Sequence, residues 1–289
     1  MKITRRQFLA GSAGTIAGAV LFSRLAGAAP GKIRVGACDW SLGVISPKGI
    51  DLAKDAGLDG LEISAGNPAE VLKIADADWR KQYKDKMAAT GIVAASTAMG
   101  LLNSAPLATD PRGPAWLDQV IDATKDLDAK VILLAFFGKG DLRDGDGNLK
   151  PKDVDVVVQR LKDAAPKAKE KGVILGIENT LSAQQNLDIL ERVQSDSVLV
   201  YYDIRNSTDN GYDVPGEIRF LADRICQIHF KDGDHYLGEG EVKMEPVAEA
   251  IAAINYGAWV VLETSVPSKD RVADFKKNAE YTRQLLKIG

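Results

Sequence analysis

The stretch VILGIENT, residues 173–180, points to the fold class of this chain. Five positions that are apolar or glycine lead directly into Glu178 and Asn179. A short, continuous apolar run is typical of a strand that is covered on both faces, as in a parallel sheet. A strand this apolar is expected to end in an uncharged turn, yet this one carries a carboxylate to its end. The remaining strands of the chain explain why.

Eight segments of the chain share this strand-like character. They are residues 33–39, 59–64, 92–98, 131–137, 173–178, 198–203, 225–230 and 258–264. Each is followed by a stretch in which apolar residues recur at helical spacing. Four strands are preceded by a glycine that is expected to end a helix in a left-handed conformation. These glycines are Gly57, Gly91, Gly172 and Gly257.

Eight strands that alternate with helices predict an α/β fold, namely a single-domain (β/α)8 TIM barrel. An open doubly wound sheet is the alternative, because its strands and helices alternate too. Such a sheet normally carries a G-x-G-x-x-G nucleotide loop after an early strand, and the sequence has none there. The barrel is therefore the preferred prediction.

The first 28 residues have the pattern of a twin-arginine export signal. The sequence TRRQFLAG, residues 4–11, precedes an apolar run from Ile16 to Phe22 and an Ala26-Gly27-Ala28 cleavage site. An uncleaved membrane anchor is the alternative, but the run is short, rich in small residues and interrupted by Arg24. We therefore expect the twin-arginine machinery to export the protein to the periplasm or the cell exterior, with no stable membrane anchor. Residues 29–289 then form the barrel domain.

Charge and cysteine content limit the classes of partner. Removing residues 1–28 takes away four basic residues and no acidic ones, so the formal net charge changes from −3 to −7. A protein this acidic has little electrostatic reason to bind nucleic acid or anionic lipid. Cys38 and Cys226 are too few for a disulfide scaffold, and we expect them to pack as small apolar residues.

The last four predicted strands each end in a side chain that can bind a metal ion. These side chains are Glu178, Asp203, His229 and Glu263. The carboxyl ends of barrel strands form the face on which such barrels keep their active sites. Three buried carboxylates would repel one another and would lose hydration without a counter-charge, so a divalent cation is expected between them. Any one of these acids alone could instead cap a loop or pair with a basic residue.

The donor set indicates which ion to expect. Three carboxylates and one imidazole, with no thiolate, favour Mn2+ in octahedral geometry, with Mg2+, Co2+ or Zn2+ as alternatives. Side chains alternate along a strand, so the residues two positions before each ligand should also face the barrel interior. These positions hold Gly176, Tyr201, Gln227 and Val261. We expect them to form a mostly apolar plug beneath the ion.

The motifs around these residues resemble those of the xylose isomerase-like TIM barrel superfamily, the sugar phosphate isomerase/epimerase group. The resemblance covers about residues 33–286, and its most specific parts are GIEN, YYDIRN, IHFKD, LGEGEV and VLET. It implies that the four strand-end residues are metal ligands and that Glu178 and Glu263 also form an acid/base pair. The ketose epimerases of this group usually carry His where this chain has Asn206, and Arg where it has His235. The resemblance thus implies the metal chemistry, with different contacts to the sugar.

Five residues are candidates for contact with a carbohydrate substrate: Trp40, Glu62, Asn206, Lys231 and His235. Asn206 and His235 take the family's sugar-contacting positions. Trp40 follows the first predicted strand and Glu62 lies on the second; for each of them the alternative is a packing or capping role. Lys231 shares the inward face of His229, and its alternative is a salt bridge with Asp232 or Glu239.

These features favour a metal-dependent isomerase or epimerase that removes a proton next to a carbonyl group of a free sugar or keto-sugar. A keto-inositol dehydratase or keto-glycoside lyase, which begins with the same step, is the alternative on the same metal site. A non-catalytic exported sugar-binding protein is the second alternative. The sequence leaves open which sugar is bound, isomerase versus lyase, the metal, cleavage of the signal and whether the protein is a homo-oligomer.

Overall fold

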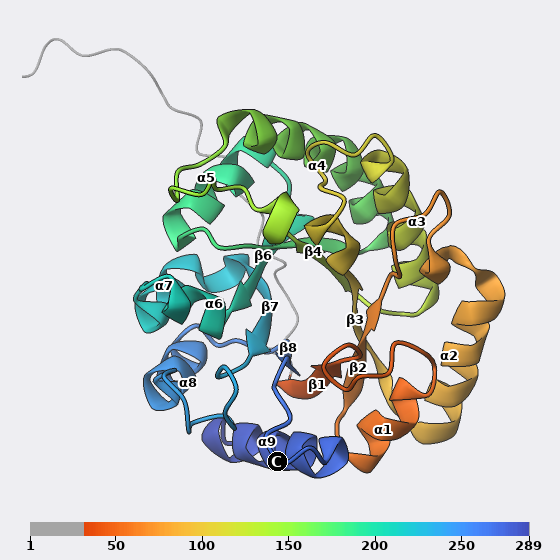
Figure 1. Ribbon diagram of the computed structural model, residues 1–289, viewed down its shortest axis with the longest axis vertical. Coiled ribbons are helices and arrows are strands. Elements are labelled where there is room, and N and C mark those ends of the chain that lie inside the picture. The colour runs from red at the N-terminus through yellow and green to blue at the C-terminus, as the bar shows by residue number, and fades with distance from the viewer. Residues whose placement is uncertain (1–31, 289) are drawn as a thin grey trace, which may run out of the picture.

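The computed structural model describes residues 32–288, and the predicted signal of residues 1–28 lies outside this range. Eight parallel strands form one closed barrel in chain order, as the sequence predicts (Figure 1). The strands are β1 (Arg34–Cys38), β2 (Gly60–Ser64), β3 (Val93–Met99), β4 (Val131–Ala135), β5 (Ile174–Glu178), β6 (Val198–Asp203), β7 (Ile225–Phe230) and β8 (Trp259–Leu262).

Helices surround the barrel and connect successive strands (Figure 1). The α-helices are α1 (Gly49–Asp55), α2 (Ala77–Thr90), α3 (Gly113–Asp126), α4 (Pro151–Lys171), α5 (Ala183–Val193), α6 (Ile204–Asp209), α7 (Val214–Leu221), α8 (Met244–Ala253) and α9 (Arg271–Leu285). Short 3-10 helices are η1 (Lys73–Ala75), η2 (Gly100–Asn103), η3 (Gly138–Gly140) and η4 (Ala222–Arg224). Within residues 32–288, none of the helices combines the length and the apolar character that crossing a bilayer requires.

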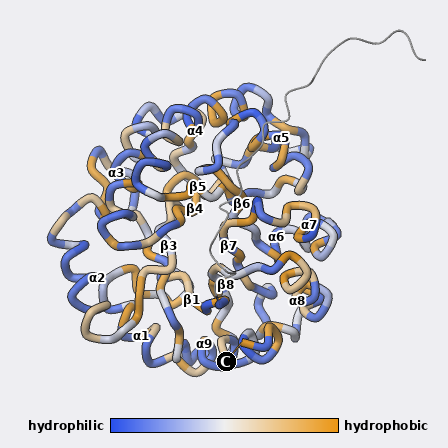
Figure 2. The backbone as a smooth tube through the Cα atoms, turned by 180° about the vertical axis from the view of Figure 1, so that it is seen from behind, coloured by the Kyte–Doolittle hydropathy of each residue, from blue (hydrophilic) through white to orange (hydrophobic). Residues whose placement is uncertain are grey.

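Helix α4 shows how the sequence forms this outer layer. Its apolar residues recur three and four positions apart, and Val154, Val158 and Leu161 are buried against the barrel. Figure 2 shows the resulting alternation of hydrophilic and hydrophobic stretches along the surrounding helices. The helix ends at Gly172, which has a φ of 67° and so takes the left-handed conformation that glycine adopts without strain.

The other predicted helix-ending glycines behave in the same way, with one exception. Gly57 and Gly91 have φ values of 68° and 78°. The prediction for Gly257 is wrong, because Asn255 takes the left-handed conformation instead, with a φ of 51°. Helix α8 ends at Ala253, so the chain has to turn before it reaches Gly257. Asparagine tolerates this conformation better than most residues.

The amino-terminal end of the barrel is filled by Trp259 at the start of β8. A Cβ atom at Gly60 would lie 2.6 Å from the Trp259 ring, so only glycine leaves room for it. The Arg34 guanidinium lies 4.2 Å from the ring centroid on this side. The barrel is therefore closed at this end, and access to its interior comes from the carboxyl ends of the strands.

Candidate metal centre and substrate pocket

Four side chains from successive strands meet at the carboxyl end of the barrel. Each of Glu178, Asp203, His229 and Glu263 offers one ligand atom, and these atoms all lie within 4.8 Å of one another. Glu178 and Asp203 are 4% exposed and His229 is fully buried, whereas the Glu263 side chain is 22% exposed. The strand-end pattern in the sequence thus corresponds to one compact cluster.

The Asp203 carboxylate is oriented by the start of helix α6. Its Oδ1 atom accepts hydrogen bonds from the backbone N–H groups of Arg205 and Asn206, both at 2.8 Å. This is the N-cap arrangement that satisfies free donors at a helix start. The Oδ2 atom is buried, and no hydrogen bond of regular geometry reaches it. Because Oδ1 is held by the backbone, Oδ2 is the oxygen that can bind an ion, and in this structure the Lys231 ammonium group lies 3.0 Å from it.

The His229 ring is held between two groups of acids. Its Nδ1 atom lies 2.9 Å from Glu178 Oε1, 3.7 Å from Glu263 Oε2 and 3.8 Å from Asp203 Oδ2. Its Nε2 atom lies 3.0 Å from Glu62 Oε1 and 3.4 Å from the Cys38 thiol. Nδ1 is therefore the nitrogen available to an ion, and Nε2 must then carry the proton, which Glu62 accepts.

The prediction that Glu62 lines the substrate pocket is wrong. This carboxylate is fully buried beneath His229. Its Oε2 atom accepts hydrogen bonds from the hydroxyl groups of Ser96 and Tyr201, the latter at 2.8 Å. Glu62 lies two residues before Ser64 in β2, and Ser64 is the residue of this strand that reaches the pocket. Its contact with His229 makes it a residue that positions a ligand.

The plug beneath the cluster is less apolar than predicted: Val261 is buried there as expected, but Tyr201 and Gln227 bring polar groups into it. Gln227 donates hydrogen bonds to the hydroxyl groups of Ser96 and Tyr201, both at 2.9 Å, and these groups in turn bond Glu62. Cys38, expected to pack as an apolar residue, donates to Glu62 at 3.6 Å. A buried carboxylate requires such donors, because an unpaired one would be strongly destabilising. The layer below the cluster is thus a connected polar network.

Lys231 contributes a positive charge to the cluster. Its Nζ atom lies 2.7 Å from Glu263 Oε2 and 3.0 Å from Asp203 Oδ2. Burial works against the charged form, but these two acids raise the pKa of Lys231 above its ordinary value. The predicted alternative partners are wrong: Asp232 accepts hydrogen bonds from the backbone N–H groups of Gly238, Gly240 and Val242, and Glu239 pairs with Lys277.

The two glutamates have different surroundings. Burial raises the pKa of Glu178 to about 7, a shift that His229 partly offsets. Burial would also raise the pKa of Glu263, but His229, Lys231 and a hydrogen bond from Trp40 together hold it below its ordinary value. These two carboxyl groups therefore differ in how readily they hold a proton.

The residues present fit a divalent cation. Three carboxylates and one imidazole are available within 4.8 Å of one another, and one buried carboxylate oxygen, Asp203 Oδ2, has no regular hydrogen bond. This donor set suits Mn2+ or Mg2+ better than a structural zinc site. The side chains of Glu178, Asp203, His229 and Glu263 would hold the ion. The buried cluster of Cys38, Glu62 and His229 lies beneath it and uses the same imidazole.

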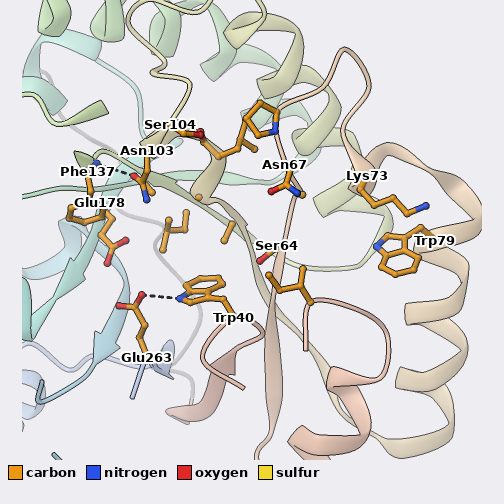
Figure 3. A pocket seen from close by; sticks show the side chains of 18 residues that line it. Trp40, Ser64, Asn67, Lys73, Trp79, Asn103, Ser104, Phe137, Glu178 and Glu263 are labelled. Carbon is orange, nitrogen blue, oxygen red and sulfur yellow. Dashed lines mark hydrogen bonds between the residues drawn. The ribbon is translucent and has the colours of Figure 1, made fainter. Parts of the chain in front are cut away.

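A cavity of about 690 Å³ opens in front of this cluster and is lined by Glu178, Glu263 and Trp40 among others (Figure 3). The Trp40 indole N–H donates to Glu263 Oε1 at 2.9 Å, and its ring meets the His229 ring edge-on at 6.2 Å. Trp40 is thus part of the pocket, as the sequence predicts.

Two predicted sugar contacts lie elsewhere. Asn206 is in the first turn of α6, where its backbone N–H donates to the capping carboxylate of Asp203, and it does not line this cavity. His235 is exposed and lines a separate cavity of about 270 Å³ with Arg205 and Glu241. The expectation that both face the substrate is therefore not met. Lys231 is also not among the residues that line this cavity, and its ammonium group pairs with Asp203 and Glu263.

The sequence prediction missed several residues of the pocket wall. They are Ser64, Asn67, Lys73, Trp79, Asn103 and Phe137 (Figure 3). It also missed Asp39, the residue directly after β1. Its carboxylate accepts hydrogen bonds from the Ser64 backbone N–H at 2.8 Å and from the Ser64 hydroxyl at 2.5 Å. This contact holds the chain at the end of β2 against the end of β1. The signal that could have revealed Asp39 is the one used for the other sites, an acid at the end of a predicted strand.

Replacing Glu62 by Gln should weaken metal binding by about 10- to 100-fold, the range for partners of ligating histidines. All four groups around the Glu62 carboxylate donate hydrogen bonds when Nδ1 is the ligating atom, so an amide N–H2 would face a donor on one side. Competition with a fluorescent chelator would measure the change. Glu70→Gln, at an exposed carboxylate, is the control and should bind metal as the unaltered protein does.

Comparisons with known proteins agree with this architecture. Residues 50–285 match the xylose isomerase-like TIM barrel family, and the chain belongs to that family. A 2-epi-5-epi-valiolone 7-phosphate 2-epimerase from Actinoplanes sp. is 25% identical, over 69% of this chain and 73% of its own. An L-ribulose 3-epimerase from Mesorhizobium japonicum is 26% identical, over 70% of each chain. A solved structure of L-ribulose 3-epimerase superposes with a TM-score of 0.71, covers 88% of this chain and 95% of its own, and is 23% identical.

Proposed function

We propose that this protein is a metal-dependent sugar epimerase or isomerase that moves a proton at the carbon next to a carbonyl group. The observation that carries the proposal is the pair Glu178 and Glu263, which belong to the buried cluster and also line the cavity. Both relatives described above are named as epimerases, which supports this class. Mn2+ is the proposed ion.

Each group of the site has a role in this proposal. A divalent ion, when bound, would stabilise the negative charge that develops on a substrate oxygen as the proton leaves. Glu178 and Glu263 exchange protons with the substrate carbon, one removing a proton and the other returning one from the opposite face. Trp40 orients Glu263 through its indole N–H. Glu62 holds the His229 ring from below.

Isotope exchange tests the proposal directly. The metal-loaded protein, incubated in D2O with a panel of keto-sugars, should incorporate deuterium at the carbon next to the carbonyl. NMR of the recovered sugar would locate the label and identify any epimer that forms. Absence of exchange across the panel would contradict the proposal and would favour the non-catalytic sugar-binding alternative.

A keto-glycoside lyase or keto-inositol dehydratase is the second candidate on the same residues. The size of the cavity, about 690 Å³, favours it because the leaving group of a glycoside needs room beyond the sugar. Its first step is the same proton removal, so isotope exchange would not distinguish the two. Mass spectrometry of the product would, since loss of water or of the substituent is incompatible with simple epimerisation.

We also propose that the protein is exported through the twin-arginine route, on the basis of residues 4–28. Replacing both Arg5 and Arg6 by Lys should retain the protein in the cytoplasmic fraction, because this route reads the arginine pair. Cell fractionation and the mass of the purified protein would show the result. Equal export of the unaltered protein and of the variant with both arginines replaced would contradict the proposal.

A further inference from the structure

The cavity in front of the cluster is larger than a single sugar ring requires. Its volume of about 690 Å³ lies well within the ~300–1,000 Å³ range of pockets that enclose drug-sized ligands. It runs from Glu178 and Glu263 at one side to Trp79 and Lys73 at the other (Figure 3). A sugar whose reacting carbon lies at the two carboxylates would leave the Trp79 side unfilled.

Much of the cavity lining is apolar. It includes Ile45, Pro68, Leu101, Trp79 and Phe137, of which Phe137 lies beside Glu178 (Figure 3). Ile45 is 56% exposed, so much of its side chain is accessible to a ligand in the cavity that it lines. Trp79 is held edge-on against the buried Tyr83 ring, with centroids 5.9 Å apart. This side of the cavity is suited to a flat or apolar group.

The charges of the pocket disfavour a phosphorylated substrate. Among the residues that line this cavity, all within the described range 32–288, Lys73 is the one cationic side chain. Its Nζ atom is already 2.6 Å from Asp76 and 4.7 Å from the centroid of the Trp79 ring. Phosphate recognition normally uses Arg, Lys or a helix start directed at the anion. Here the lining adds two carboxylates instead.

Building on the proposed function, we propose that the substrate is an unphosphorylated glycoside of a keto-sugar: its carbonyl-bearing ring is held at Glu178 and Glu263, and its substituent, a second ring, packs against Trp79. The apolar walls supply affinity for the face of that ring. Asn67 and Ser104, which line the same cavity, supply polar contacts to the sugar or to the glycosidic oxygen. An aromatic aglycone and a second sugar both present such a ring face.

Calorimetry on the metal-loaded protein tests this inference without requiring turnover. The probes are methyl and phenyl glycosides of glucose, galactose and xylose, matched disaccharides, and glucose 6-phosphate. For at least one sugar, the phenyl glycoside or the disaccharide should bind about tenfold more tightly than the methyl glycoside, because part of a ring leaves water. The better of the two identifies the source of the ring. Equal affinities, tighter binding of the phosphate, or no binding of any probe would overturn the proposal.

Variants of Trp79 test whether the tighter binding of glycosides with a second ring depends on this side chain. Trp79→Ala should reduce the ratio of phenyl to methyl affinity to less than about threefold, whereas Trp79→Phe should retain most of it because an aromatic face remains. If Trp79→Ala does not fold, Asn67→Trp is the second variant and should lower the same ratio by filling the cavity. An unchanged ratio in a folded variant would overturn the proposal. Because these are binding ratios, they stand independently of the isotope-exchange result that tests the proposed function.

Discussion

Replacing Glu178 by Gln should abolish epimerisation, with a decrease of at least about 10³-fold in rate. General acid–base groups contribute about 10²- to 10⁴-fold, and this residue also belongs to the metal cluster. Glu263→Gln should have an effect of similar size. The rate is measured on whichever pair of epimeric sugars the unaltered protein interconverts.

The two variants should differ in which epimer they still label. If one glutamate removes the proton from one face and the other serves the opposite face, each variant retains deuterium exchange into one epimer of the pair only. Separate incubations of each epimer in D2O, read by NMR, would show this complementary pattern. Elemental analysis of both variants shows whether the ion is still bound, because an amide oxygen can replace a carboxylate oxygen as a ligand.

Glu191→Gln is the matched control for Glu178→Gln. It makes the same chemical change in helix α5, directly after β5, but at an exposed position. This control should epimerise at the normal rate. Normal epimerisation by a metal-loaded Glu178→Gln protein would contradict an acid/base role for this residue.

The sequence predicted the cluster because strand ends are set locally. In a parallel barrel every strand runs in the same direction, so an acid at the end of an apolar run necessarily reaches the carboxyl face. The register confirms this for Asp203 and His229, which are paired across β6 and β7. The same rule gave the strand boundaries to within a few residues.

Depth within the barrel was not predictable in the same way. Glu62 lies in β2 with the inward alternation that the sequence indicates, but it is paired with Cys38 and Ser96, below the level of the pocket. Its level depends on the stagger between neighbouring strands, which no single strand encodes. The polar network beneath the cluster follows from this, because a carboxylate at that depth requires Ser96, Tyr201 and Gln227 as neighbours.

The pocket wall depended on loop paths. Helix α6 begins at Ile204, directly after β6, so the Asn206 backbone N–H bonds the Asp203 carboxylate. Asn206 therefore belongs to the first turn of this helix and does not line the cavity. Trp79, by contrast, belongs to the first turn of α2, and the segment after β2 brings it to the far side of the cavity. Residue spacing alone does not reveal either path, because loops have no fixed periodicity.

Removing the metal should abolish isotope exchange and lower the melting temperature by about 5–10 °C. An ion present at about 100 times its dissociation constant stabilises the folded protein by about 2.7 kcal/mol, and each kcal/mol shifts the melting temperature by about 2–4 °C at this size. The comparison is between protein dialysed against EDTA and the same sample reloaded with Mn2+. Activity and melting temperature that are unchanged in protein shown by elemental analysis to be metal-free would contradict a role for the ion.

A variant of Lys231 should change how strongly the ion stabilises the protein. Its ammonium group lies 2.7 Å from Glu263 and 3.0 Å from Asp203, so it offsets part of the negative charge when the ion is absent. Lys231→Met keeps the length of the side chain but removes this charge, and it leaves the carboxylates without a counter-charge in the metal-free protein. The difference in melting temperature between metal-loaded and metal-free protein should therefore be larger in Lys231→Met than in the unaltered protein. A smaller difference would mean that Lys231 mainly stabilises the metal-loaded state, as a group that contacts the substrate or the ligands there.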